Sequence, residues 1–497
     1  MTPPPLALHT FRDRLDQSKR AGASRLTAPH AHEAPSRTKV RSPGRVLRLV
    51  LAAVAGCLVA TLAAPCRAES EGRLRLEWNT FSKEGRTAAG WTSWAARDEI
   101  QPLCSVDTAH FRSGPDALAI AGNGNPAEYG GWVCTAPGIK AGHYYRLRAY
   151  YRTQSVPDAR RQVVARLDWR DSNGGRVGQP DYAFEETADG DWTCVTFSVP
   201  APPMSTTVRI ELSLGWAPRG TVWWDDITLE ETEPPPARWV RVGTISLHPK
   251  DDPDNLGAFL RAIDQISRDQ PDIVCLGEEI LVEGNSRSYA SVAEPIPGPS
   301  TSRLGEKARQ YHLYIVAGLT EREGGVVYNA AVLIDRQGRV AGKYRKVYLP
   351  REEIEGGMTP GDSYPVFATD FGKIGIMICW DNEYVDGARA MAVQGAEILF
   401  VPSAGGYLTL LKARALENHL YVVSSGYGME SAIIDPTGTV LFATNDSGVN
   451  KTIPINLAER FVDPWLGDMR ARFHKEIRDD VPVPGLTGQP PAGGPRP

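Results

Sequence analysis

The stretch Gly372-Lys373-Ile374-Gly375-Ile376-Met377-Ile378-Cys379-Trp380-Asp381 is an apolar, β-branched run that ends in a single cysteine followed by polar residues. A thiol at the end of a strand can project into a cleft and receive backbone N–H groups from the following turn, and both favour the thiolate. We therefore take Cys379 as a candidate nucleophile. The alternative is a small core residue, because cysteine is among the residue types most often buried.

Two upstream segments also end in chemically useful residues. The apolar segment 271–278 (PDIVCLGE) closes on Glu278, a candidate general base, and the segment 342–350 (GKYRKVYLP) places Lys346 after a strand. These three residues are separated by 68 positions (346 − 278) and 33 positions (379 − 346). Glu, Lys and Cys at strand ends in this order resemble the carbon–nitrogen hydrolase (nitrilase) superfamily.

The resemblance extends from about residue 239 to about residue 478. It includes phrases that the chemistry alone would not dictate, namely Gly387-Ala388-Arg389, Gly395-Ala396-Glu397-Ile398-Leu399, Val401-Pro402-Ser403, Ala413-Arg414-Ala415-Leu416-Glu417-Asn418 and Ser431-Ala432-Ile433-Ile434-Asp435-Pro436-Thr437-Gly438. It implies an α/β four-layer αββα sandwich and, because members pair their sheets across a dimer, a homo-oligomer.

Three departures from the superfamily pattern concern the substrate side. Asn382 and Glu383 stand where many members have a Phe-Pro-Glu-like stretch, and Gly277 precedes Glu278 where proline is frequent. The connection 404–412 is short, which predicts a more open pocket.

The chemistry of the three side chains predicts a mechanism. The Cys379 thiolate would attack a planar carbon bonded to nitrogen, and Glu278 would take the thiol proton, pass it to the departing nitrogen and then activate water. Lys346 and the N–H of Trp380 would stabilise the oxyanion. In the resembled superfamily a second carboxylate assists; of the three glutamates in segment 351–355, Glu353 fits best, and a solvated acidic loop is the alternative.

The residues after the nucleophile bear on the bond that is cleaved. In the superfamily, nitrilases proper usually have Cys-Trp-Glu and amidases and carbamoyl hydrolases usually have Cys-x-Asp, whereas this chain combines Trp380 with Asp381. The shorter acid, the acidic loop and the open pocket favour an amidase acting on a small linear amide or carbamoyl substrate. The alternatives are a nitrilase, N-acyl transfer to an amine, and a catalytically inactive secreted glycan-binding protein.

A metal or other cofactor is not expected. The nine histidines are scattered, with no pair at ligand spacing beside a third ligand, and the seven cysteines form no Cys-x-x-Cys motif.

Residues 1–68 predict an export segment. A basic tail precedes sixteen mostly apolar residues, 49–64, which suit the hydrophobic region of a signal peptide better than a full bilayer span. The exported protein would be secreted or periplasmic; lipid attachment at Cys57 and an uncleaved membrane anchor are the alternatives. Without 1–68 the chain has 44 Lys/Arg (55 − 11) and 56 Asp/Glu (59 − 3), and a net charge of −12 argues against nucleic acid as a partner.

Residues 69–236 predict a separate all-β domain. Short alternating segments separated by turn clusters indicate an antiparallel sandwich, and the phrase 220–227 (GTVWWDDI) resembles jelly-roll carbohydrate-binding modules of the galactose-binding type. Trp91, Trp94 and Trp132 have loop-like surroundings and are the best candidates to stack on a glycan. One disulfide among the three cysteines of this region, Cys104, Cys134 and Cys194, is expected in an exported domain.

The linker 233–236 leads into residues 237–480, where strands and helices alternate. Segment 239–247 predicts a strand, and 255–269 predicts a helix with Asp254 as its cap. A further helix at 302–311, a strand at 314–319 and a hairpin across 335–338 continue the pattern of sheets covered by helices. The Pro/Gly-rich tail 481–497 predicts disorder.

Overall fold

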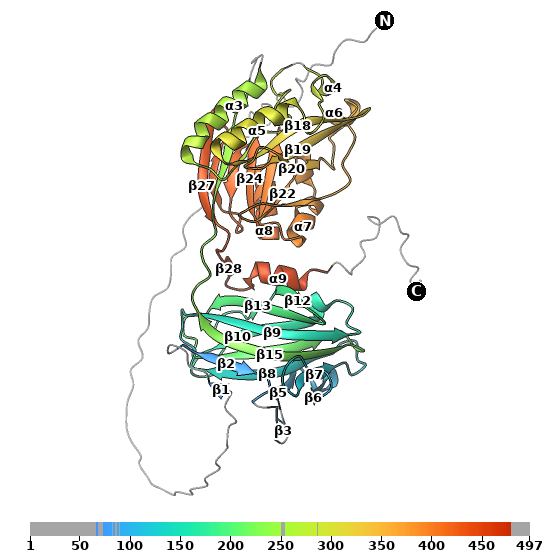
Figure 1. Cartoon of the computed structure of the whole chain (residues 1–497), viewed down its shortest axis with the longest axis vertical. Coiled ribbons are helices and arrows are strands. Elements are labelled where there is room, and N and C mark those ends of the chain that lie inside the picture. Colours follow the sequence, from blue (N-terminus) through green and yellow to red (C-terminus); the bar gives the residue numbers. More distant parts are fainter. Residues whose placement is uncertain are drawn as a thin grey trace, which may run out of the picture. The chain divides into compact units, whose positions relative to one another are not determined.

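The computed structural model describes residues 66–67, 73–81, 83–84, 87–88, 90–249, 254–285 and 287–478. Figure 1 shows these residues in colours that follow the sequence. The predictions of an export segment and of a disordered tail fall outside the described residues, apart from the two-residue strand β1, and the domain boundaries stay predictions. Among the described helices, none is long and apolar enough to cross a membrane.

Residues 66–67 and 73–232 form two antiparallel sheets, which we call the N-terminal sandwich. One sheet has the order β1-β2-β15-β9-β13-β12 with β7 and β6 attached to β15, and the other has the order β11-β10-β14-β8-β5. The strands are β1 (Cys66–Arg67), β2 (Arg75–Trp78), β5 (Thr92–Ala95), β6 (Leu103–Asp107), β7 (Ala117–Ala121), β8 (Tyr129–Pro137), β9 (Tyr144–Gln154), β10 (Val163–Arg170), β11 (Asp181–Tyr182), β12 (Glu185–Asp189), β13 (Trp192–Pro200), β14 (Thr207–Gly215) and β15 (Thr221–Thr232). A separate two-stranded ribbon pairs β3 (Lys83–Glu84) with β4 (Thr87–Ala88), and the short helices are η1 (Asp98–Ile100) and α2 (Ala159–Gln162).

The period-two alternation of these strands places large apolar side chains on the inner faces. Leu147 and Trp224 from one sheet and Leu167 and Ile210 from the other are fully buried in one core. The predicted antiparallel pairing of this region is present, whereas a jelly-roll relationship stays a prediction.

Two sequence expectations about the N-terminal sandwich are wrong. Trp91 is fully buried, and Trp132 is 5% exposed on β8 with its indole N–H donating to the Ala119 carbonyl, so neither ring can stack on a ligand. Large rings fill the inner face of a sandwich even when polar residues flank them in the sequence. The three cysteines of this region are free thiols, so the expected disulfide is absent from the described residues.

Residues 239–457 form two six-stranded mixed sheets, which we call the αββα sandwich. The first has the order β20-β19-β18-β17-β16-β27 and the second the order β21-β22-β23-β24-β25-β26. The strands are β16 (Trp239–Ser246), β17 (Ile273–Cys275), β18 (Tyr314–Glu323), β19 (Val326–Ile334), β20 (Val340–Arg345), β21 (Val366–Ala368), β22 (Lys373–Ile376), β23 (Ile398–Ser403), β24 (Tyr421–Gly426), β25 (Ser431–Ile434), β26 (Val440–Thr444) and β27 (Val449–Asn456). Strands β16–β18 and β22–β24 run parallel, as strand-helix alternation predicts.

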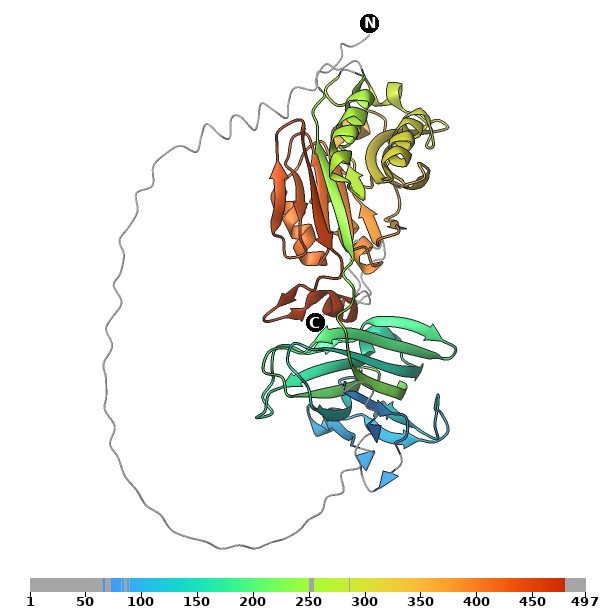
Figure 2. The same cartoon turned by 60° about the vertical axis from the view of Figure 1, so that its left-hand side comes forward.

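Helices cover the outer faces of both sheets. The helices are α3 (Asn255–Ile266), continued by η2 (Ser267–Asp269), α4 (Tyr289–Val292), α5 (Pro299–Tyr311), α6 (Arg351–Glu355), η3 (Cys379–Glu383), α7 (Asp386–Val393) and α8 (Leu408–Asn418). Figures 1 and 2 show α3 and α5 side by side over the first sheet, and apolar residues of α7 and α8 pack with the second sheet. The predicted α/β sandwich with four layers is therefore confirmed for this part of the chain.

Local sequence features set the limits of these elements. The Asp254 side chain accepts a hydrogen bond from the Gly257 N–H at 2.9 Å, which confirms it as the cap of α3. Helix α5 begins three residues earlier than predicted because Pro299 suits the first helical position. The hairpin at 335–338 is present between β19 and β20. After β27 the chain forms β28 (Val462–Asp463), β29 (Gly467–Asp468) and α9 (Met469–Glu476).

Candidate active site

The three residues taken from the sequence lie just after strands of both sheets of the αββα sandwich. Glu278 follows β17, Lys346 directly follows β20, and Cys379 follows β22. Because β17 and β20 belong to one sheet and β22 to the other, the site draws on both sheets. Functional groups of open α/β sheets commonly lie at such carboxyl ends.

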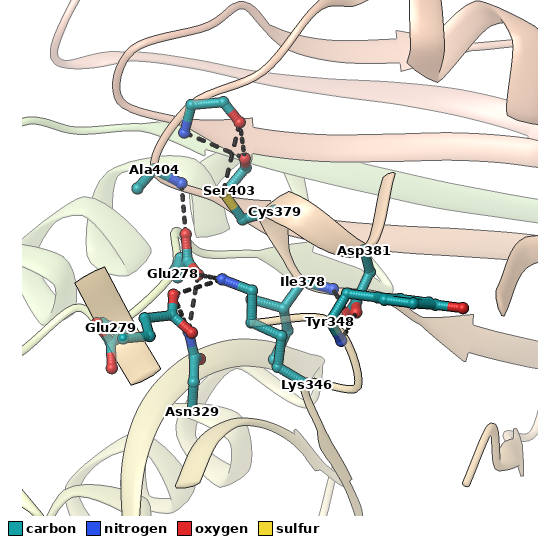
Figure 3. A network of polar contacts seen from close by, with 12 residues as sticks. Glu278, Glu279, Asn329, Lys346, Tyr348, Ile378, Cys379, Asp381, Ser403 and Ala404 are labelled. Atoms are coloured by element: carbon teal, nitrogen blue, oxygen red, sulfur yellow. Dashed lines mark hydrogen bonds and ion pairs between the residues drawn. The ribbon is translucent and has the colours of Figure 1, made fainter. Parts of the chain in front are cut away.

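Three donors hold Glu278 in one orientation (Figure 3). Its Oε1 accepts hydrogen bonds from Lys346 Nζ at 2.8 Å and Asn329 Nδ2 at 2.8 Å, and its Oε2 accepts one from the Ala404 N–H at 2.7 Å. The residue is 3% exposed. Charge-assisted bonds such as the one from Lys346 are stronger than neutral ones, so this side chain is held firmly in place.

Gly277 makes room for the tyrosine that fixes the backbone at Glu278. A Cβ at position 277 would lie 2.2 Å from the hydroxyl of Tyr427. That hydroxyl donates to the Glu278 carbonyl at 2.9 Å. The glycine at this position therefore has a steric cause, and it need not loosen the loop.

Lys346 lies between two carboxylates. Its Nζ forms ion pairs with Glu278 and Glu353, and its side chain is fully buried. Asn329, on β19 and fully buried, donates from one Nδ2 to the same two carboxylates, at 2.8 Å and 3.2 Å. The Oε2 of Glu353 is buried without a hydrogen-bond partner.

The ionisation of this network follows from burial and from the single cation. Burial opposes the charge on Lys346, but Glu278, Cys379 and Glu353 outweigh it and raise the pKa of Lys346 well above its ordinary value. Burial also raises the pKa of Glu353 to about 7, although Lys346 opposes this shift. The pKa of the neighbouring Glu279 is raised well above its ordinary value by burial and by the carboxylates of Glu278 and Glu353.

Cys379 occupies a strained backbone position at the start of η3. Its φ is +45°, in the left-handed region that costs a non-glycine residue about 1–3 kcal/mol. The thiol donates to the Gly405 carbonyl at 3.5 Å. Burial raises the pKa of this thiol to about 12, and Glu278 adds to the shift while Lys346 opposes it. The resting sulfur is therefore a thiol, and a role as a nucleophile would require a base.

The remaining sequence candidates separate clearly. Of the three glutamates in α6, Glu353 is buried in the network, whereas Glu352 and Glu355 are exposed and pair with Arg351. The Trp380 side chain is 39% exposed beside Cys379.

Sequence reasoning missed two residues of the network. Asn329 is a polar side chain inside the apolar strand β19, and this break in the pattern could have identified it. The sequence interpretation uses Asp381 only to distinguish amidases from nitrilases. In the structure it is 1% exposed, and its carboxylate accepts hydrogen bonds from protein groups, so it cannot contact a substrate.

Over the residues that the structure describes, no cluster of three or more His, Cys, Asp or Glu side chains is arranged to hold a metal ion. The polar groups of the site are instead a thiol, an ammonium group and carboxylates. Such a set can carry out nucleophilic substitution with proton transfer.

Comparison with known proteins agrees with this chemistry. Residues 241–458 match the family described as carbon-nitrogen hydrolase. A Schizosaccharomyces pombe protein described as a probable nitrilase is 33% identical over 195 residues, which cover 35% of this chain and 70% of that protein. The omega-amidase of Mus musculus is 27% identical over 256 residues, covering 46% of this chain and 88% of the relative.

Among solved structures, a carbon-nitrogen hydrolase from Helicobacter pylori is similar, with a TM-score of 0.39 and 23% identity over 44% of this chain and 90% of that one. An amidase from Nesterenkonia sp. has a TM-score of 0.40 and 22% identity over 48% and 94% of the two chains.

The αββα sandwich and its thiol site thus define a hydrolase of carbon–nitrogen bonds. The chain belongs to the carbon–nitrogen hydrolase family of the nitrilase superfamily.

Proposed function

We propose that this protein hydrolyses a small linear amide or carbamoyl compound through a thioester on Cys379, with Glu278 and Lys346 as its catalytic partners. One observation carries the proposal: adjacent residues of one loop hold both reacting groups. The Ala404 N–H binds the Glu278 carboxylate, and the Gly405 carbonyl accepts from the Cys379 thiol. The same loop therefore orients both the base and the nucleophile.

The first half of the reaction forms the thioester. Glu278 takes the thiol proton as the sulfur bonds to the carbonyl carbon, and the carbonyl electron pair moves to oxygen. The charge of Lys346 and the N–H of Trp380 stabilise this oxyanion. When the oxyanion collapses, the C–N bond breaks and Glu278 returns the proton to the departing nitrogen.

The second half releases the acid. Glu278 takes a proton from water as the water oxygen attacks the thioester carbon. The C–S bond then breaks, the sulfur regains the proton, and the carboxylic acid leaves. No redox step is required, and water is the co-reactant.

Glu353 favours an amide over a nitrile. Its buried Oε2 has no partner and can accept a hydrogen bond from an amide N–H, which a nitrile lacks. The shorter side chain of Asp381 does not itself favour an amide substrate, because its carboxylate oxygens already accept hydrogen bonds from protein groups. Nitrile hydrolysis and acyl transfer to an amine remain the alternative reactions.

The test is a panel of matched compounds at equal concentration. Small linear amides and carbamoyl compounds should release ammonia or amine, and the corresponding nitriles should do so much more slowly. The opposite ranking would make the protein a nitrilase. If an added amine captures the acyl group faster than water does, the protein is an acyltransferase.

We propose glycan binding as a second function of the N-terminal sandwich. Trp216 is 46% exposed in the left-handed region at φ +53°, and its ring lies 5.5 Å from that of Tyr129, which lies 6.1 Å from that of Trp94. Exposed aromatic rings can stack on the C–H face of a sugar. Export and self-association are proposed alongside these functions, on the sequence features given above.

A further inference from the structure

The Asp381 carboxylate joins the two segments that carry Lys346 and Cys379. Its Oδ1 accepts hydrogen bonds from the N–H groups of Val347 at 3.2 Å and Tyr348 at 2.8 Å, and its Oδ2 accepts one from the Ile378 N–H at 3.0 Å. Figure 3 shows Asp381 with Tyr348 and Ile378. A fourth bond, at 2.7 Å, comes from the Tyr344 hydroxyl on β20. The donors thus come from both sides of the site.

The hydrogen-bond donors to Asp381 include direct chain neighbours of Lys346 and Cys379. Val347 directly follows Lys346, and Ile378 directly precedes Cys379. Along the chain Lys346 and Cys379 are separated by 33 residues (379 − 346), which include α6 and β21, and their preceding strands belong to different sheets. A direct link is therefore needed to hold a fixed distance between the ammonium group and the sulfur.

A second contact joins the same two segments. The Tyr348 ring stacks on the Tyr384 ring with centroids 3.7 Å apart and planes 11° apart, and the Tyr348 hydroxyl donates to Asp386. Tyr384 and Asp386 follow the nucleophile turn, just as Tyr348 follows Lys346. A stacked aromatic pair contributes about 0.5–1.5 kcal/mol beyond its buried area, so this contact adds to the link made by Asp381.

We propose that Asp381 is a positioning residue that sets the distance between Lys346 and Cys379, and through it the reactivity of the thiol. This inference rests on the proposed function. Glu278 and Lys346 are the charged groups that face the Cys379 sulfur. Because Lys346 favours the thiolate and Glu278 disfavours it, a small displacement of the ammonium group alters both thiolate formation and oxyanion stabilisation. A misplacement of about 1 Å can reduce a rate by about 10².

Asp381→Asn tests the proposal because it keeps the shape of the side chain. The amide nitrogen of asparagine is a donor and would face donors. The hydrogen bonds to at least one of the two segments, that of Lys346 or that of Cys379, are therefore lost. We expect kcat to fall by about 10² with KM changed by less than about threefold. Alkylation of Cys379 by iodoacetamide at pH 8 should slow by about tenfold, as a thiol pKa higher by about one unit would produce.

Asp335→Asn is the matched control. Asp335 is 7% exposed and accepts from the N–H groups of Gln337 and Arg339, both at 2.9 Å, in the hairpin at the other end of β19 from Asn329. The control should lower Tm while kcat and the alkylation rate stay at their wild-type values.

The results separate positioning from general stability. A folded Asp381→Asn protein with wild-type kcat and alkylation rate would overturn the proposal, as would faster alkylation, which a loosened fold would give. If that variant does not fold, Tyr344→Phe removes one of the four donors, and it should slow both rates by a smaller factor; unchanged rates would overturn the proposal. The alkylation needs no substrate, so its result stands even if no amide is hydrolysed and the proposed function fails.

Discussion

Lys346→Met should destabilise the αββα sandwich, and the loss should grow with pH. The substitution removes the one cation that pairs with the buried carboxylates of Glu278 and Glu353. Breaking a buried ion pair from one side typically costs about 3–5 kcal/mol, because an uncompensated charge is left in the interior.

The pH dependence follows from Glu353. Its pKa is raised to about 7 in the folded protein from its ordinary value of 4.5, a difference worth about 3 kcal/mol. A carboxyl with a raised pKa contributes stability that is fully present below its unfolded pKa and is lost as the pH rises through its folded pKa. Without Lys346 this pKa rises further, so Glu353 is protonated in the folded variant over a wider pH range. The free-energy cost of that protonation, relative to the unfolded carboxyl, is small at pH 5 and larger at pH 8.

Hydrogen exchange resolved by peptide is the suitable assay. Nine of the twelve tryptophans lie in residues 69–236, so tryptophan fluorescence would report mainly on the N-terminal sandwich. Peptides from β18 and β23 should show a loss of protection for Lys346→Met that is larger at pH 8 than at pH 5, once intrinsic exchange rates are corrected.

Lys343→Met is the matched control. Lys343 pairs with the buried Glu321, but Glu321 keeps Arg345, whose Nε and Nη2 lie at 2.8 and 3.0 Å. The control should therefore lose about 1 kcal/mol or less of its free energy of unfolding. The reasoning would be refuted if the two variants lost equal amounts of hydrogen-exchange protection. It would also be refuted if Lys346→Met lost more protection at pH 5 than at pH 8.

Three further outcomes are expected. Cys379→Ala should abolish turnover and leave the far-ultraviolet circular dichroism unchanged, because a small residue leaves little cavity; residual activity above background would contradict the thiol mechanism. Glu353→Gln should lower kcat for amides by about 10- to 100-fold, since an amide cannot replace the charged partner of Lys346; wild-type kcat would exclude a role in the site. Trp216→Ala in the full chain should weaken binding to glycans on an array by about tenfold, whereas Trp239→Ala, an exposed tryptophan outside the N-terminal sandwich, should not.

The sequence was sufficient to predict the layers of the αββα sandwich. The helical spacing of α3, the cap at Asp254 and the hairpin at 335–338 are local features, and each appears where the sequence indicates it. Glu278 and Cys379 each end an apolar run, and Lys346 follows a strand-like segment, so the placement of all three after strands could also be read from the chain.

The contacts between segments could not be read in this way. The four bonds of Asp381 join residues that are 33 to 37 positions away in the chain with one that is 3 positions away, and no periodicity marks such a set. The prediction that Trp91 and Trp132 stack on a glycan is wrong because it used only the local sequence around each ring. Their loop-like sequence surroundings suggested exposed positions, but the packing of two sheets buries both rings.

The most direct test of the central claim is the mass of the Cys379 peptide during turnover. The wild-type enzyme, saturated with a hydrolysed amide and quenched in acid, should carry the acyl group on this peptide, and hydroxylamine added before the quench should convert that group to the hydroxamate. Turnover that continues with an unmodified Cys379 peptide and without hydroxamate would contradict the thioester mechanism.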